Sequence, residues 1–101
     1  MITVTAKEVE AMIRDDLDFL HCVVAQLDVA LSGAAPSEAR NKLIANNERL
    51  EIFLYNLPEN IAAHGPFRDE DHLQRAAQSE VKRALVLLDS SHKLLTTVGT
   101  A

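Results

Sequence analysis

Aromatic residues and cysteines are scarce in this chain of 101 residues. It contains no Trp, three Phe, one Tyr and a single cysteine, Cys22. One cysteine excludes both an internal disulfide and a zinc site built from several thiolates. Glycine and proline number only three each. Long stretches are therefore free of the two residues that most often interrupt a helix.

Long apolar runs and an excess of positive charge are also missing. No run approaches the roughly 18 apolar residues of a transmembrane helix. Lys7 and Glu8 lie where a signal peptide would be apolar. The net charge of −5 argues against general nucleic-acid binding and against binding to an anionic membrane. We therefore expect a soluble cytoplasmic protein with no nucleic-acid or membrane partner. In that compartment Cys22 is reduced, and we expect it to fill a small apolar site.

Aliphatic residues at helical spacing make up much of what remains. Hydrophobic residues are 48% of the chain, enough to form the core of one domain over residues 1–101. In three segments, candidate core residues recur at alternating steps of four and three. This spacing places them in one line along a helix, which we call a seam, and such a seam packs against other helices. We predict an all-α fold, an antiparallel up-down-up three-helix bundle with helices over about 6–32, 38–57 and 69–97. The seam positions are Ile13, Leu17, Leu20, Val24, Leu27 and Leu31; Ala39, Leu43, Asn46, Leu50, Phe53 and Leu57; and Ala77, Val81, Ala84, Leu88, Ser91, Leu95 and Val98.

Local signals mark the helix ends. Thr5 and Glu8 have the spacing of a capping box, in which each side chain binds the backbone N–H of the other residue. Gly33 is suited to a left-handed residue that ends the first helix. Pro58 disfavours helical backbone at Leu57. We therefore expect the second helix to end there and a short separate turn to follow.

Asn46 interrupts the second seam. A buried Asn fixes the register and number of packed helices at some cost in stability. The alternative places Asn46 at the edge of the seam, in contact with water. We favour this second interpretation.

The second and third segments carry more apolar surface than one seam can use. Residues 85–88 and 52–55 are consecutive apolar runs, so their side chains point to all sides of a helix. In a chain this short, the additional side is better explained by a partner than by the chain itself. We predict a protein-binding surface that supports a dimer or larger assembly, formed by Leu85, Val86, Leu87 and Leu94 with Ile52 and Tyr55.

The negative charge is concentrated in the first segment. Residues 5–32 have a net charge of −4, whereas residues 38–57 and residues 68–97 each contain equal numbers of acidic and basic side chains. Such a face could dock to a basic partner. We favour the simpler interpretation of a solvated helix face that keeps the protein in solution.

Three Asp-x-x-His pairs raise the alternative of a metal site assembled by oligomerisation. Di-iron bundles direct Glu-x-x-His pairs and further Glu ligands inward. Here two of the three pairs flank the seams or point away from them, and Asp is shorter than Glu. Surface pairs are the simpler interpretation, so we expect no metal and no cofactor. The pairs are Asp18 and His21, Asp69 and His72, and Asp89 and His92.

A second alternative is a histidine phosphotransfer module. The sequence from His72 to Ala77 resembles the His-x-x-Lys-Gly pattern, with Arg75 in place of Lys. The sequence around His92 resembles the phosphoacceptor box of sensor kinases, with Lys93 in place of the acid. Glycine-rich phosphate loops, nucleophile elbows and His-Glu-x-x-His are all missing from the sequence. We therefore expect no enzymatic activity and no small-molecule substrate.

In its general form, a small, acidic, helical and aliphatic chain, the protein resembles helical bacterial secretion and flagellar export chaperones. It also resembles small phage or plasmid accessory proteins. This resemblance implies binding to other proteins. The function predicted from the sequence is thus a non-enzymatic protein–protein interaction module that associates with itself.

Overall fold

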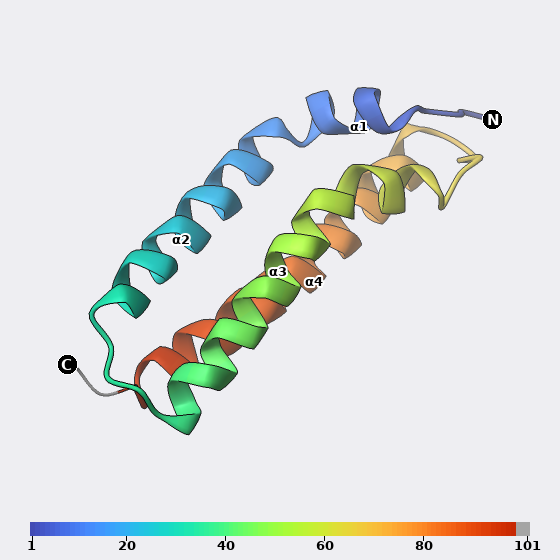
Figure 1. Ribbon diagram of the computed structural model, residues 1–101. Helices are drawn as coiled ribbons and strands as arrows, with labels where there is room; N and C mark the ends of the chain where they lie inside the picture. The colour runs from blue at the N-terminus through green and yellow to red at the C-terminus, as the bar shows by residue number, and fades with distance from the viewer. Residues whose placement is uncertain (99–101) are drawn as a thin grey trace.

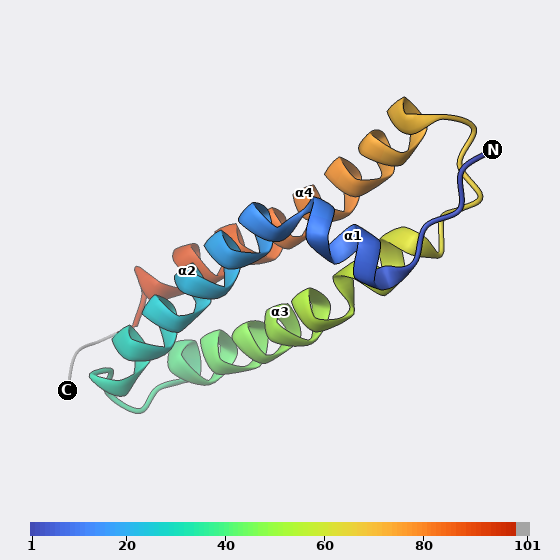
Figure 2. The same cartoon turned by 90° about the horizontal axis from the view of Figure 1, so that it is seen from above.

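Four helices form the described part of the chain. The computed structural model describes residues 1–98, with α1 (Ala6–Met12), α2 (Arg14–Ser32), α3 (Glu38–Ala62) and α4 (Glu70–Leu95) in that order. The helices α1 and α2 follow one another along the antiparallel pair α3 and α4 (Figures 1 and 2). The molecule is elongated, with extents of 54 × 17 × 16 Å. The all-α class is confirmed, but the three-helix bundle is not, because the first predicted helix is divided in two.

The division falls at Ile13, between α1 and α2. Ile13 has φ −106° and ψ 17°, outside the helical range, yet its N–H still donates to the Val9 carbonyl at 3.0 Å. No glycine or proline lies near this position, so no local signal marks it. Tertiary packing accounts for the bend: α1 contacts α2 and α3, whereas α2 contacts α3 and α4. Val9 and Ile13 are both buried at this bend.

The expected end of the second helix at Leu57 is wrong. The helix α3 continues through Pro58 to Ala62, and the separate turn expected after Leu57 is part of it. Proline removes one backbone hydrogen bond from a helix interior, which opposes this continuation. Leu57, Pro58 and Ile61 are all buried, and burial of this apolar surface stabilises the longer helix.

The other helix ends agree closely with the sequence. The Thr5 and Glu8 side chains form the predicted capping box at the start of α1. The helix α2 ends at Ser32, directly before Gly33, but Gly33 has φ −98°. This helix end therefore does not use the left-handed conformation that we expected. Asp69 caps α4 by accepting the His72 N–H at 2.8 Å.

The core follows the predicted seams. All six seam residues of the first segment are buried, and Leu43, Leu50 and Leu57 of α3 have no exposed surface. Phe67, in the connection between α3 and α4, is also completely buried. Two backbone hydrogen bonds join it to Ile2, at 2.6 and 2.7 Å, so the start of the chain closes this end of the molecule.

Asn46 is buried, contrary to the interpretation that we favoured. Its exposed fraction is 8%, and its Nδ2 donates to the Leu87 carbonyl at 2.9 Å and to Ser91 Oγ at 2.6 Å. Ser91 Oγ in turn donates to Asn47 Oδ1 at 2.7 Å, and Asn47 Nδ2 donates to Asp28 Oδ1 at 3.3 Å. These hydrogen bonds join α2, α3 and α4.

Candidate functional site

The surface between α3 and α4 contains a hollow of about 540 Å³. Its α3 wall follows one stripe of the helix, because its residues recur at steps of three and four. The stripe differs from the face of α3 that carries Leu50, Leu54 and Leu57 into the core. We call this hollow the α3–α4 groove; it is lined by Arg49, Ile52, Phe53, Asn56, Asn60, Arg83, Val86 and Leu87.

Three of the six predicted interface residues lie in the groove. Ile52 and Val86 are each 63% exposed, which is high for branched aliphatic side chains, and Leu87 is partly buried against the core. The structure therefore brings residues of the two predicted patches together at one place. They come from different helices and are more than 30 positions apart in the sequence.

The other three predicted interface residues lie elsewhere. Leu85 is adjacent to Val86 in sequence, but it lines a separate hollow with Met12 and Ile13. Tyr55 is 84% exposed on α3 and does not line the groove. Leu94 is half-buried near the end of α4. The single apolar strip that the sequence predicted along α4 is thus divided over different sides of the molecule.

Two arginines and Phe53 belong to the groove and were missed at the sequence level. Phe53 was assigned to the core seam, but it is only partly buried. The Arg83 guanidinium lies over its ring, 5.6 Å from the ring centroid. Such cation–π contacts orient a guanidinium beside an apolar surface. The steps of three and four from Arg49 to Asn60 were a signal that could have identified this face.

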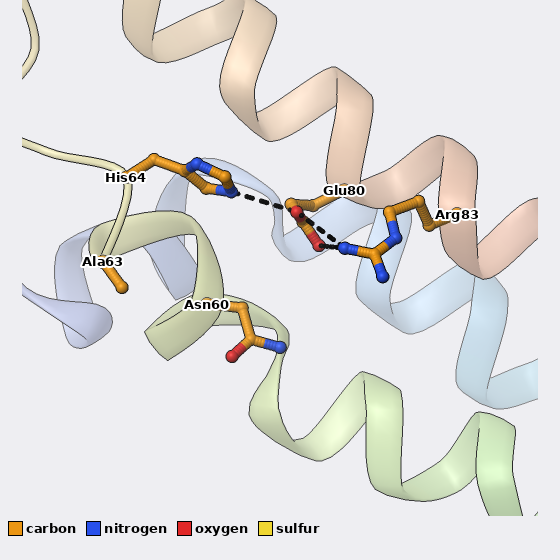
Figure 3. A pocket seen from close by; sticks show the side chains of 5 residues that line it. All are labelled: Asn60, Ala63, His64, Glu80 and Arg83. Atoms are coloured by element: carbon orange, nitrogen blue, oxygen red, sulfur yellow. Dashed lines mark hydrogen bonds and ion pairs between the residues drawn. The ribbon is translucent and has the colours of Figure 1, made fainter.

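A second hollow, of about 330 Å³, shares Asn60 and Arg83 with the groove and contains a buried carboxylate (Figure 3). Glu80 is 4% exposed. Its Oε1 lies 3.0 Å from His64 Nε2, and Arg83 Nη1 donates to both carboxylate oxygens at 3.3 and 3.4 Å. A buried carboxylate is costly unless it is paired. These contacts satisfy Glu80, so it acts as a structural anchor for Arg83.

The Asp-x-x-His pairs do not converge. Within residues 1–98 there is no group of three or more His, Cys, Asp or Glu side chains placed to hold a metal ion. Asp69 is used as the cap of α4, and Asp89 forms an ion pair with Lys93 at 3.0 Å. These contacts fit the simpler interpretation, in which the pairs belong to helix surfaces.

The histidines considered for phosphotransfer lie at opposite ends of α4. His72 is half-buried in its first turn, with its ring edge-on to Phe67 at 5.3 Å. Its Nδ1 accepts the Arg68 N–H at 3.1 Å. His92 is exposed in the last turn, where a basic side chain interacts favourably with the helix dipole. His72 thus makes structural contacts at the start of α4, whereas His92 is exposed to solvent at its end.

Cys22 is exposed on α2, so the expectation that it fills an apolar site is wrong. Gln26 Nε2 lies 3.9 Å from its sulfur. Position 22 falls on the side of α2 opposite Leu20, Val24 and Leu27, which are buried.

Comparison with known proteins adds no relative: the chain matches no protein family, no curated protein and no solved structure. None of the helices in the described part of the chain combines the length and the apolar character needed to cross a membrane.

Proposed function

We propose that the protein is a non-enzymatic protein-binding module that uses the α3–α4 groove as its contact surface. The observation that carries this proposal is the apolar floor of the groove. Ile52 and Val86 are each 63% exposed there, whereas most other large aliphatic side chains of the same two helices are buried or partly buried. Exposed apolar surface that is clustered in a hollow and bordered by polar groups is typical of protein interaction sites.

The border of the groove supports the same function. Arg49 from α3 and Arg83 from α4 line the groove beside the apolar floor, and Asn56 and Asn60 add amide groups on α3. Arginine is enriched at protein interfaces because its guanidinium combines directed hydrogen bonds with apolar stacking. The proposal includes no catalytic step, and the cytoplasmic location stays a prediction from the sequence.

Val86→Asp tests this function. Aspartate in place of valine removes apolar area from the centre of the contact and introduces a charge that has no partner there. We expect weaker association by about tenfold or more, the effect of about 1.4 kcal/mol. Multi-angle light scattering measures self-association, and affinity capture with quantitative mass spectrometry measures binding of other proteins. Helix content by circular dichroism should not change, because Val86 is exposed.

Leu85→Asp is the matched control. It introduces the same charge one residue away on the same helix, in a different hollow. If the groove is the protein-binding surface, Leu85→Asp keeps the association that Val86→Asp loses. Equal behaviour of the two variants would exclude the groove as the contact surface.

A further inference from the structure

An exposed stripe on α2 has the complementary chemistry to the groove. Phe19 is 59% exposed and Val29 is 71% exposed, although both are large apolar side chains. At 100° per residue Val29 projects opposite the buried leucines of α2, and Phe19 projects toward one edge of that exposed side. Acidic side chains accompany them. We call this surface the α2 stripe; it consists of Asp15, Asp18, Phe19, Cys22, Gln26 and Val29, all of which are exposed.

The charges of the two surfaces are opposite. The groove carries Arg49 and Arg83, and Arg83 is paired with the buried acid at its end, Glu80, so Arg49 supplies the excess positive charge. The α2 stripe carries Asp15 and Asp18 and no basic residue. A pairing of two grooves would bring arginines together, and a pairing of two stripes would bring aspartates together. Groove and stripe are therefore the electrostatically matched combination.

The lengths of the two surfaces also agree. Phe19 and Val29 are ten residues apart, which is about 15 Å along a helix. Arg49 and Asn60 are eleven residues apart, or about 16 Å. A helix that presents apolar side chains over this distance fits a groove formed between two helices. The α2 stripe of one molecule can thus cover the whole apolar floor of another.

We propose that the α3–α4 groove binds the α2 stripe of a second copy of the chain. This inference rests on the proposed function and names its partner. Each copy has one groove and one stripe, so the contact is heterologous: the groove of one molecule takes the stripe of the next. Repetition of this contact produces an open chain of molecules or a closed ring, of which the smallest is a twofold dimer with two reciprocal groove–stripe contacts.

Mixing two defective variants tests this arrangement. Val86→Asp damages the groove and leaves the stripe intact, while Phe19→Asp damages the stripe and leaves the groove intact. We expect wild type to form assemblies whose mass rises with concentration. Each variant alone should be monomeric or associate at least about tenfold more weakly, as expected for a lost apolar anchor. An equimolar mixture should form a one-to-one dimer and nothing larger, because only one intact groove and one intact stripe remain.

Controls separate this proposal from the proposed function. Analytical ultracentrifugation gives the masses, and circular dichroism confirms that both variants remain helical. A mixture that stays monomeric, or a wild-type protein that is monomeric at the highest concentration, overturns the proposal that the α2 stripe of a second copy binds in the α3–α4 groove. If Val86→Asp loses association and Phe19→Asp does not, a different surface fills the groove: the inference fails and the proposed function stands. If neither variant changes the mass of an assembling wild type, both fail.

Discussion

At the residue scale, Glu51 shows how packing changes the titration of a side chain. Glu51 lies on α3, and its pKa is raised above the ordinary glutamate value. Partial burial is the largest cause, followed by the carboxylate of Asp28 on α2, with a smaller effect from Glu48. Desolvation and neighbouring negative charge both disfavour the ionised form. Ionised Glu51 is therefore a source of repulsion between α2 and α3.

Glu51→Gln should raise the stability of the protein at neutral pH. A raised pKa in the folded state means that the folded protein binds this proton more tightly than the unfolded chain. The resulting stabilisation is present in acid and is lost as the pH rises through the folded pKa. Neutral Gln removes the repulsion at neutral pH, so we expect a higher Tm than wild type there. The difference should vanish as the pH falls below the ordinary glutamate pKa.

Thermal unfolding followed by circular dichroism over a pH series measures this effect. Glu59→Gln is the control, because it removes an exposed acid further along the same helix. A Tm for Glu51→Gln that is equal to wild type at neutral pH, or an advantage that persists in acid, would contradict the assigned repulsion.

At the scale of the element, α1 depends on its cap and its contact with α3. Seven residues are too few for a helix that is stable alone in water. The Glu8 N–H donates to Thr5 Oγ1 at 3.2 Å, and the Thr5 N–H donates to Glu8 Oε1 at 3.2 Å. Val9 supplies the buried contact, with 1% exposure. The cap and the contact together explain why so short a helix forms.

Thr5→Ala should destabilise α1. Loss of a threonine cap typically costs about 1 kcal/mol. We expect the amides of the first turn of α1 to exchange faster with solvent, as measured by hydrogen–deuterium exchange with mass spectrometry. Thr3→Ala, which removes an exposed threonine outside the helix, should leave this exchange unchanged. Similar protection in wild type and Thr5→Ala would show that the cap does not hold α1 in place.

At the scale of the whole molecule, a polar network joins three helices within an otherwise aliphatic core. It connects Asp28 of α2 through Asn47 and Asn46 of α3 to Ser91 of α4. Ser91 is completely buried. Aliphatic seams alone allow one helix to slide along another, whereas buried polar groups are satisfied in one register. The network thus favours one arrangement of α2, α3 and α4.

Ser91→Ala should reduce the free energy of unfolding by about 1–3 kcal/mol, because the buried Asn47 Oδ1 loses its hydrogen-bond donor. Urea denaturation measures this change. Ser90→Ala is a close control: Ser90 Oγ donates only within its own helix, to the Val86 carbonyl at 3.2 Å. Surface changes of this kind stay within about 0.5 kcal/mol. Equal losses for the two serines would mean that the network contributes nothing specific.

The helical class, the core seams and most helix ends could be predicted from the amino-acid sequence alone. These features depend on neighbours three or four residues apart, so local spacing and capping residues are sufficient to predict them. The bend at Ile13, the continuation of α3 through Pro58 and the burial of Asn46 depend on how the helices pack against one another. Packing also sets which apolar residues share a surface, because it brings Ile52 together with Val86 and separates Leu85 from them. Each of these outcomes depends on what a neighbouring helix places against the residue, and helical periodicity does not contain that information.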